Sequence, residues 1–316
     1  MRAEQEVWRK SKDKTNMKRI LITGANSYIG TSVERYLLEY NAKTGREQYH
    51  IDTLSLRNLA WEQYDFSSYD TVFHVAGIAH ADIGHVSEET KKQYYEVNCD
   101  LAVKTAEKAK REGVPQFVYM SSVIVYGESA PVGGKKHITA ETKPAPANFY
   151  GDSKWQAEQQ LRTIESGQFA VAVLRPPMIY GRNSRGNFKM LLSLAQKTPV
   201  FPSISNERSM LYIENLAEFV RLLIDSQKGG LYFPQNKDYV TTAQMVKAIG
   251  EADGKNITLL GMLNPFVRLA AKMPGKIGGM ANKAFGTLTI DQGLSVREID
   301  GYQKYDLMES VKKSVG

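Results

Sequence analysis

The sequence of 316 residues has a single cysteine and no long run of apolar residues. Cys99 has no second cysteine with which to form an intramolecular disulfide, and one thiol cannot supply a thiolate metal cluster. No apolar stretch approaches the roughly 20 residues that a membrane-spanning helix needs. The charged N-terminal segment also has no apolar core of the kind found in signal peptides. We therefore expect a cytoplasmic protein that does not insert stably into a membrane.

Histidine is also scarce, with five in the chain. Four of them, His50, His80, His85 and His137, lack the spacing with aspartate or glutamate that a metal site needs. We expect no bound metal.

Basic residues outnumber acidic ones and give a net charge of +7. A basic surface can meet nucleic acid, an acidic membrane face or an anionic small substrate. Much of the excess lies in or beside residues 1–16, which we interpret as a flexible basic leader. It comes from Arg2, Arg9, Lys10, Lys12, Lys14, Lys18 and Arg19. No basic helix with interleaved aromatic residues stands out beyond this leader, so we expect no nucleic-acid partner.

Strand and helix signals alternate through residues 17–175. Short apolar runs predict strands at 19–23, 49–56, 71–76, 116–120 and 169–174, and helical spacing predicts helices at 29–40, 90–112 and 150–164. Strands that alternate with helices form βαβ units with right-handed crossovers. The sequence therefore predicts an α/β fold with a Rossmann-type, doubly wound parallel sheet.

The pattern is looser in residues 176–316. It predicts helices at 188–196, 216–226 and 243–252 and a strand at 231–233. We expect this part to form a smaller substrate-binding lobe that is partly interleaved with the sheet. The apolar stretch 257–271 could be a membrane-surface helix, but Pro265 interrupts it and Gly261 weakens it. We interpret it as a lid or packing segment.

A glycine-containing turn separates the first strand from the first helix. A dinucleotide pyrophosphate needs a tight turn, close approach of the backbone and a helix N-terminus at this point. We predict that this turn binds the cofactor. The residues concerned are Gly24, Asn26, Ser27, Tyr28, Ile29 and Gly30.

The end of the second strand bears on the choice between NAD and NADP. An acidic residue there would bind the adenosine ribose of NAD, but Asp52 lies too early in the strand. Ser55 and Arg57 would instead accept a 2′-phosphate. Arg57 is equally well interpreted as a solvated strand end, so both cofactors stay open.

Tyr150 and Lys154 are four residues apart on one face of a predicted helix. An ammonium near the phenol favours the phenolate, so we expect the pKa of Tyr150 to fall below its usual value near 10. Tyr150 could then exchange a proton with a substrate oxygen. Ser121 and Ser122 follow the fourth strand, where a hydroxyl could bind the same oxygen.

These features together resemble the extended short-chain dehydrogenases of the NAD-dependent epimerase/dehydratase family. The turn has the family pattern T-G-x-x-G-x-x-G with Ser27 at the middle glycine, and S-S-x-x-V-Y-G precedes Y-x-x-x-K. The resemblance implies a catalytic triad of Ser122, Tyr150 and Lys154, because Ser122 directly precedes the x-x-V-Y-G residues.

The same resemblance implies further contacts. For the cofactor these are Ala76 in H-x-A-G, the pair Asp65–Phe66 at adenine, the helix residue Asn98, the triad residues Tyr150 and Lys154, and Pro177. For the substrate they are Ser122, Val123, Asn187 and Arg208. It also implies a homodimer formed by helices that flank the sheet.

The family contains several activities. Val123 and Ile124 occupy the positions of the acidic residues that eliminate water in 4,6-dehydratases, and their side chains cannot transfer protons. We therefore predict that the chain is not a dehydratase. A 4-epimerase of a UDP-linked sugar is favoured. The alternative is an NAD(P)H-dependent 4-ketoreductase, since residues 283–291 resemble bacterial reductases of surface-polysaccharide pathways. A non-catalytic dinucleotide sensor is less favoured, because a sensor has no need of the triad.

Overall fold

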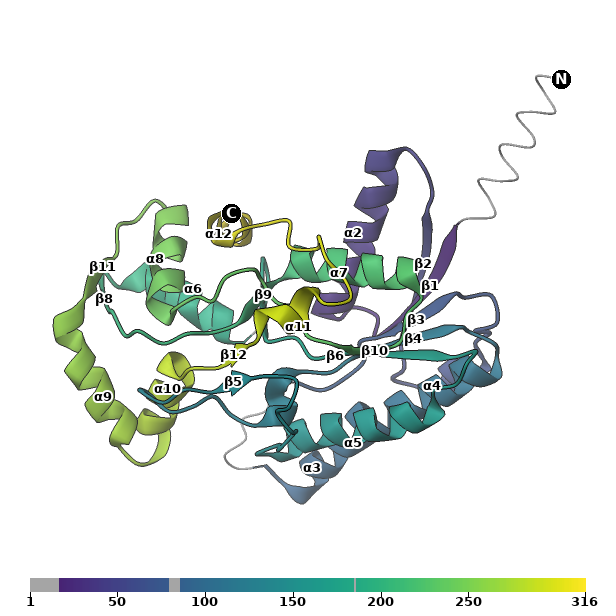
Figure 1. Ribbon diagram of the computed structural model, residues 1–316, viewed down its shortest axis with the longest axis horizontal. Coiled ribbons are helices and arrows are strands. Elements are labelled where there is room, and N and C mark those ends of the chain that lie inside the picture. The colour runs from purple at the N-terminus through teal and green to yellow at the C-terminus, as the bar shows by residue number, and fades with distance from the viewer. Residues whose placement is uncertain (1–16, 80–85, 185) are drawn as a thin grey trace.

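The computed structural model describes residues 17–79, 86–184 and 186–316. The predicted leader, residues 1–16, and two of the histidines, His80 and His85, lie outside the described residues. The α/β fold is confirmed (Figure 1).

A parallel sheet of six strands forms the centre of the N-terminal part, in the order β10-β6-β4-β3-β1-β2. The strands are β1 (Lys18–Thr23), β2 (Tyr49–Leu54), β3 (Thr71–His74), β4 (Gln116–Met120), β6 (Ala170–Leu174) and β10 (Gly230–Tyr232). The order reverses on either side of β1, and ligands of open α/β sheets bind outside the carboxyl ends of the strands at such a point.

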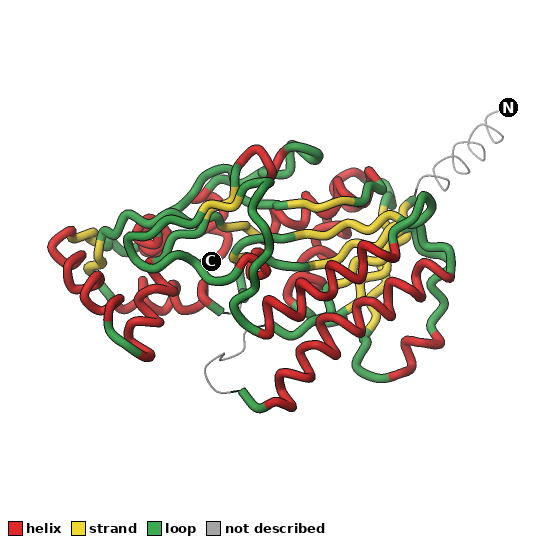
Figure 2. The backbone as a smooth tube through the Cα atoms, turned by 60° about the horizontal axis from the view of Figure 1, so that its bottom comes forward, coloured by secondary structure: helices red, strands yellow, loops and turns green. Residues whose placement is uncertain are grey.

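Helices cover both faces of this sheet, as Figures 1 and 2 show. One face is covered by α2 (Tyr28–Thr44) and α7 (Ile213–Ser226), and the other by α4 (Leu101–Arg111) and α5 (Phe149–Ile164). Successive strand residues point to opposite faces. In β1, Ile20 and Ile22 therefore pack with α2 and α7, while Leu21 packs with α4 and α5.

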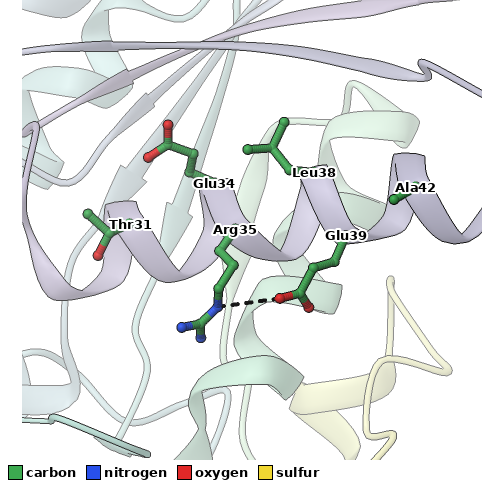
Figure 3. A pocket seen from close by; sticks show the side chains of 6 residues that line it. All are labelled: Thr31, Glu34, Arg35, Leu38, Glu39 and Ala42. Carbon is green, nitrogen blue, oxygen red and sulfur yellow. Dashed lines mark ion pairs between the residues drawn. The ribbon is translucent and has the colours of Figure 1, made fainter.

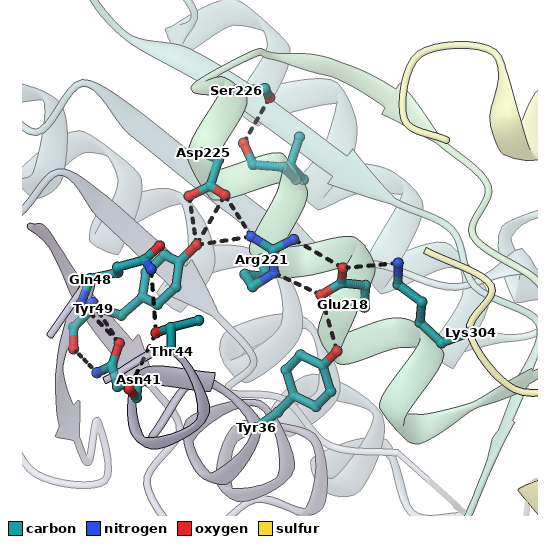
Figure 4. A network of polar contacts seen from close by, with 11 residues as sticks. Tyr36, Asn41, Thr44, Gln48, Tyr49, Glu218, Arg221, Asp225, Ser226 and Lys304 are labelled. Atoms are coloured by element: carbon teal, nitrogen blue, oxygen red, sulfur yellow. Dashed lines mark hydrogen bonds and ion pairs between the residues drawn. The ribbon is translucent and has the colours of Figure 1, made fainter. Parts of the chain in front are cut away.

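A buried polar network holds α7 to α2 and β2 (Figure 4). Arg221 of α7 donates to Glu218 at 2.7 and 2.9 Å, to Asp225 at 2.8 Å and to the Tyr49 hydroxyl of β2 at 3.1 Å. Tyr36 of α2 donates to Glu218 at 3.0 Å. Buried charges are tolerated when they are paired and hydrogen-bonded in this way.

Several predicted boundaries differ from the structure, and two of these differences bear on the site. The strand predicted at 49–56 ends at Leu54, because the Leu54 carbonyl accepts from Gly24 N–H at 2.9 Å and the chain then turns away. The helix predicted at 90–112 is divided into α3 (Glu88–Tyr95), a π-helical turn η2 (Glu96–Asp100) and α4. Turns of this kind occur frequently at functional sites.

The C-terminal part contains three small parallel pairs of strands. They are β7 (Met178–Tyr180) with β9 (Met210–Tyr212), β8 (Val200–Pro202) with β11 (Thr258–Leu260), and β5 (His137–Ile138) with β12 (Thr289–Ile290). The N-terminal part of the chain contributes β5 to a strand pair of the C-terminal lobe, and the C-terminal part contributes β10 to the large sheet. The two parts of the chain are therefore interleaved.

Helices complete this lobe. They are the 3₁₀ turns η3 (Val123–Tyr126) and η4 (Gly261–Leu263), and the helices α6 (Asn187–Lys197), α8 (Thr242–Ala252), α9 (Asn264–Lys272), α10 (Gly275–Phe285), α11 (Gln292–Val296) and α12 (Leu307–Val315). No residue of α9 is fully buried, so this part of 257–271 lies at the surface and not in the core, and the interpretation as a lid or packing segment stays a prediction. Within the described residues, no helix is both long and apolar enough to cross a membrane.

Candidate active site

The turn after β1 is built for close approach of another chain segment. Gly24 has a φ of +103°, and a Cβ at this position would lie 2.7 Å from the backbone nitrogen of Ala76. Only glycine combines this conformation with this contact. Asn26 follows with a φ of 66°, in the left-handed region that asparagine tolerates. The structure therefore brings the predicted residues Gly24, Asn26 and Ala76 together.

The N-terminus of α2 opens directly from this turn. Ser27 is the N-cap, and its Oγ accepts from Gly30 N–H at 3.1 Å. The first turn of α2 carries no acidic residue, so its positive dipole end is free to attract an anion. The side chains of Tyr28 and Ile29 pack against the core, which leaves their backbone atoms for any phosphate contact.

The predicted triad comes from two elements at the same edge of the sheet. Tyr150 and Lys154 lie in the first turns of α5, and Ser122 follows β4. Gly151 packs so closely on η3 that a Cβ there would lie 2.7 Å from the Ile124 carbonyl oxygen. This contact holds the N-terminus of α5 against the residues that follow Ser122.

Lys154 lies at the centre of the site. Its side chain is 6 % exposed, its Nζ donates to the Met120 carbonyl at 2.9 Å, and it lies 4.8 Å from the centre of the Tyr119 ring. A Cβ added to Gly77 would lie 3.2 Å from Lys154 Nζ and 3.0 Å from Asn98 Oδ1. The ammonium therefore lies beside the backbone that follows β3.

Asn98 connects these segments from the π-helical turn η2. It is fully buried, its Oδ1 accepts from Ile78 N–H at 2.7 Å, and its Nδ2 donates to the Ile78 carbonyl and to Ser153 Oγ. Asn98 is therefore a fully satisfied buried polar residue, and its predicted place behind the cofactor stays a prediction.

Burial shifts the pKa values of both titratable members of the triad. It lowers the pKa of Lys154 to about 8, and it raises the pKa of Tyr150 to about 12, with a further contribution from Tyr94. The expectation that Lys154 lowers the pKa of Tyr150 is therefore wrong for this state of the protein. The reason is that both groups are desolvated and the ammonium is bonded to the Met120 carbonyl.

The two serines after β4 differ sharply. Ser121 is buried, and its hydroxyl donates to Glu158. Ser122 is partly exposed, and its Oγ accepts from Ile124 N–H at 3.2 Å. Its hydroxyl hydrogen is not committed by that bond, so Ser122 is the serine that can serve a substrate oxygen.

A buried ion pair between Glu158 and Arg175, next to the site, was not predicted from the sequence. Glu158 accepts from Nε and Nη2 of Arg175, with distances of 3.1 and 3.0 Å from Nε, and Arg175 Nη1 donates to the Tyr126 hydroxyl at 2.5 Å. Neither charged side chain is more than 2 % exposed. The available signal was the spacing, because Glu158 is four residues beyond Lys154 on the same helix.

Asp65 and Phe66 do not lie at this edge. Phe66 is fully buried, and its N–H donates at 2.7 Å to Glu112, which ends α4 at the amino side of β4. Nearby, Asp70 N–H donates to the carbonyl of Arg19 at the start of β1. The prediction that this pair contacts adenine is therefore contradicted, because the pair lies at the opposite end of the strands.

Arg57 keeps both of its interpretations. It follows Leu54, whose carbonyl is bonded to the glycine turn, so it lies close in the chain to the candidate pyrophosphate site. Its side chain is exposed.

A small pocket in the C-terminal lobe joins the two other predicted substrate residues, Asn187 and Arg208. Lys283 and Ala284 of α10 line it as well, together with Met178, which follows Pro177. Arg208 Nη1 donates to the Lys283 carbonyl at 2.8 Å. On the other side, the Pro176 carbonyl accepts from Val123 N–H at 3.1 Å, so residues 176–178 connect the triad to this pocket.

A second hollow lies on the outer face of α2 (Figure 3). All of its lining residues belong to that single helix, and Arg35 and Glu39 form an exposed ion pair at 3.8 Å. It brings together no group from the candidate site. Among the described residues, no cluster of three or more His, Cys, Asp or Glu side chains could hold a metal ion.

The donor set at the sheet edge fits a dinucleotide. The glycine turn and the start of α2 offer backbone N–H groups to a pyrophosphate, and the Lys154 ammonium offers further N–H donors to ribose hydroxyls. His74, which precedes this site, is fully buried, which lowers its pKa to about 3, and its Nδ1 is hydrogen-bonded to Thr23 Oγ1.

Comparisons with known proteins identify the family of this chain. The family model described as the NAD dependent epimerase/dehydratase family matches residues 20–234. The UDP-glucose 4-epimerase of Vibrio cholerae is 30 % identical over 295 residues, which cover 88 % of this chain and 89 % of that protein. The N-acetyl-alpha-D-glucosaminyl-diphospho-ditrans,octacis-undecaprenol 4-epimerase of Escherichia coli O157:H7 is 27 % identical over 279 residues, 81 % of each chain.

Among solved structures, the dTDP-4-dehydrorhamnose reductase of Bacillus anthracis in complex with NADP superposes with a TM-score of 0.67 at 19 % identity. It covers 94 % of this chain and 98 % of that one, and it shares the fold. The matched family, the triad-bearing elements and the glycine turn lead to one conclusion. The chain belongs to the NAD-dependent epimerase/dehydratase family.

Proposed function

We propose that the protein is a dinucleotide-dependent 4-epimerase of a sugar carried on a diphosphate, and that the carrier is UDP. One observation carries the proposal. Lys154, Asn98 and Gly77 meet at the edge of the sheet where the glycine turn, Tyr150 and Ser122 also lie.

Each residue has a role in the proposed reaction. A bound NAD or NADP would supply the hydride acceptor and donor for C4 of the sugar. Tyr150 Oη takes the proton of the C4 hydroxyl as the C–O bond becomes a carbonyl. It returns the proton after the keto sugar has rotated in the site and presents its other face. The Ser122 hydroxyl donates to the same sugar oxygen. Atoms balance over the cycle, since one proton and one hydride leave the C4 alcohol and both return.

The charge of Lys154 is central to the first of these steps. With its pKa raised to about 12, Tyr150 is a phenol at neutral pH and cannot accept a proton until its phenolate is stabilised. In the complex with substrate and dinucleotide, the Lys154 ammonium on the same helix face is the cation that would supply this stabilisation. Its pKa of about 8 keeps it mostly charged at neutral pH.

The pocket in the C-terminal lobe suits the carrier. Arg208, Lys283 and Asn187 line the pocket together with apolar side chains, and guanidinium and ammonium groups are the donors that bind a diphosphate. Both curated relatives named above act, by their names, on sugars attached through a diphosphate. We propose that Asn187 and Arg208 contact the diphosphate or the nucleoside of this chain's substrate.

A 4-ketoreductase of a 4-keto-6-deoxy nucleotide sugar is the second candidate. The specific observation in its favour is that Lys283 and Ala284, from the segment that resembles reductases, line the substrate pocket. The two enzymes would use the same triad, but a reductase consumes NAD(P)H. A dehydratase is not proposed, because the apolar Val123 and Ile124 stand where proton transfer would be needed.

We further propose that the enzyme works in the cytoplasm as a homodimer whose contacts involve helices flanking the sheet.

The cofactor's fate separates the two candidates. An epimerase must keep its reduced cofactor, so we expect denatured protein to release a dinucleotide that mass spectrometry identifies. The protein should interconvert UDP-glucose and UDP-galactose without added cofactor and without a net change in nicotinamide absorbance. Steady loss of that absorbance with a 4-keto-6-deoxy nucleotide sugar, and no interconversion of UDP-hexoses, would overturn the epimerase and establish the reductase.

A further inference from the structure

The η4–α9–α10 segment presents an exposed apolar face that the candidate site does not use. We call this face the docking face. Its large apolar side chains are Met262, Phe266, Leu269, Met273, Ile277 and Met280. They are 45–74 % exposed, and Phe266 and Leu269 are 69 % and 65 % exposed. α9 lies at the end of the lobe remote from the six-stranded sheet, and α10 lies beside it, nearer to β5 and β12 (Figure 1; the same lobe is seen in Figure 2). Exposed apolar side chains gathered on adjoining helices are typical of an interaction site.

The docking face is amphipathic along α9. Within α9, Phe266 and Leu269 are three residues apart and so share one side of the helix. Met262 of η4 precedes them and Met273 follows at the C-cap. Arg268 and Lys272, which are also exposed, flank this side of the helix.

The two helices are held in place by the rest of the lobe. Asn282 of α10 donates to the carbonyl of Ala271, at the end of α9, at 2.9 Å, and its Oδ1 accepts from Val132 N–H at 2.9 Å. Gly278 approaches the Met273 carbonyl so closely that any Cβ there would overlap it. The apolar side chains are therefore displayed on a preformed surface.

The charge around this face has one sign. Residues 254–290 contain five basic residues and no aspartate or glutamate. Within the described part of the chain, Arg268, Lys272, Lys276 and Lys283 form no ion pair. A partner that neutralises these residues and also accepts apolar side chains must have an acidic surface with an apolar layer below it.

We propose that the docking face binds the surface of a membrane that contains anionic lipids. Helices with Lys and Arg beside an apolar stripe lie at the boundary between headgroups and acyl chains. A second copy of this chain fits less well, because a twofold interface would bring two identical basic surfaces together. The proposal goes beyond the epimerase reaction and does not depend on it.

The docking face and the pocket that contains Arg208 share the helix α10, so membrane binding would bring this pocket near the membrane. Lys283 and Ala284, at the C-terminal end of α10, line the pocket that contains Arg208. A protein bound through α9 and α10 would therefore hold this pocket close to the lipid headgroups.

Vesicle co-sedimentation of the full-length protein tests the proposal. The vesicles contain phosphatidylcholine alone or an equal mixture with phosphatidylglycerol. We expect binding to the mixed vesicles, with weaker binding as salt is raised. The variant Arg268→Ala/Leu269→Ser/Lys272→Ala should bind roughly a hundredfold more weakly, because it loses two charges and one inserting side chain.

The matched control is Leu38→Ser/Lys43→Ala/Arg46→Ala, which removes the same kinds of exposed residue from α2 and the turn after it. It should bind like the wild type, and the basic residues of the N-terminal segment are the same in all three proteins. Unchanged melting temperatures show that each variant is folded, since none of the substituted residues is buried. Equal vesicle binding by the α9 variant and the wild type would overturn the proposal, as would wild-type protein that ignores anionic vesicles at low salt. Self-association of the wild type that the α9 variant abolishes, without vesicle binding, would assign the face to a second copy instead.

Discussion

Ser121 and Ser122 are neighbours in the chain, yet their side chains lie in different surroundings. Ser121 donates to the buried Glu158, whereas Ser122 is partly exposed beside the N-terminus of α5. Substituting each in turn therefore separates a stabilising contact from a catalytic one.

Ser122→Ala should lower kcat by roughly 10²- to 10³-fold, because it removes one hydrogen-bond donor to the reacting oxygen. Its melting temperature should stay close to that of the wild type. Ser121→Ala should instead lower the free energy of unfolding by about 1–3 kcal/mol, since Glu158 loses a buried partner. Steady-state kinetics and urea unfolding measure both effects. The opposite pattern would reassign the catalytic hydroxyl to Ser121.

Tyr150→Phe should reduce turnover by roughly 10²- to 10⁴-fold while the protein keeps its dinucleotide. The phenyl ring retains the edge contact with Tyr94, whose ring centre is 6.0 Å away, and only the proton-transfer oxygen is lost. Turnover is measured with the substrate that the wild type accepts, and bound dinucleotide is measured after denaturation. Full activity in this variant would exclude Tyr150 as the proton carrier.

Lys154→Met should change how stability depends on pH. The pKa of Lys154 is about 8 in the folded protein and about 10.4 in an unfolded chain, so the unfolded chain binds more protons between these values. Wild-type stability therefore gains from Lys154 as pH rises through this window, and the full penalty of the buried charge applies below pH 8.

At pH 7 the Lys154→Met variant should have an unfolding free energy larger than that of the wild type by up to about 3 kcal/mol, less the loss of the bond to Met120. This advantage should shrink between pH 8 and about pH 10. Urea unfolding of both proteins, each stripped of dinucleotide, gives the difference. A difference that stays constant over this range would show that Lys154 does not titrate there.

Asp65 and Phe66 show why the position of a residue in the fold is hard to predict from a local sequence pattern. An acidic residue followed by an apolar one matches a family pattern, but the pattern does not say at which end of a strand the pair lies. The chain from Leu54 to Thr71 crosses from one edge of the sheet to the other, and the pair falls near its end. Only the three-dimensional structure supplies that position.

At the scale of elements, α5 carries two predicted triad residues and a buried carboxylate along one face. Tyr150, Lys154 and Glu158 follow at intervals of four residues, and the last of them pairs with Arg175 beneath the site. The first two were predicted from their spacing. Glu158 was missed because a carboxylate on a helix is usually solvated, and burial is not visible in the local pattern.

The turn after β2 contains Arg57, which is expected to affect the choice between NAD(H) and NADP(H). If Arg57 pairs with a 2′-phosphate, Arg57→Ala should weaken NADP(H) binding roughly ten- to a hundredfold more than NAD(H) binding. Arg46→Ala, another exposed arginine outside this turn, is the control and should change neither. Calorimetric titration of both dinucleotides checks this. Equal losses for the two cofactors would show that Arg57 is only a solvated side chain.

At the scale of the whole molecule, the alternation of strands and helices was sufficient to predict the parallel sheet and its two covered faces. The C-terminal lobe was less predictable because its pairings are distant in sequence. Thr289 pairs with His137 and Gly230 with Ala172, and nothing in a short apolar segment identifies so remote a partner. The exposure of α9 was missed for a similar reason, since an apolar stripe alone does not tell whether another element covers it.

The most direct test of the proposed reaction follows deuterium at C4 of the sugar. UDP-[4-²H]glucose is incubated with the protein and no added cofactor, and the products are separated and analysed by mass spectrometry and NMR. We predict that UDP-galactose forms with deuterium still at C4, because the hydride leaves to the bound dinucleotide and returns to the same carbon. Loss of deuterium to solvent, or the absence of any epimer, would contradict the account.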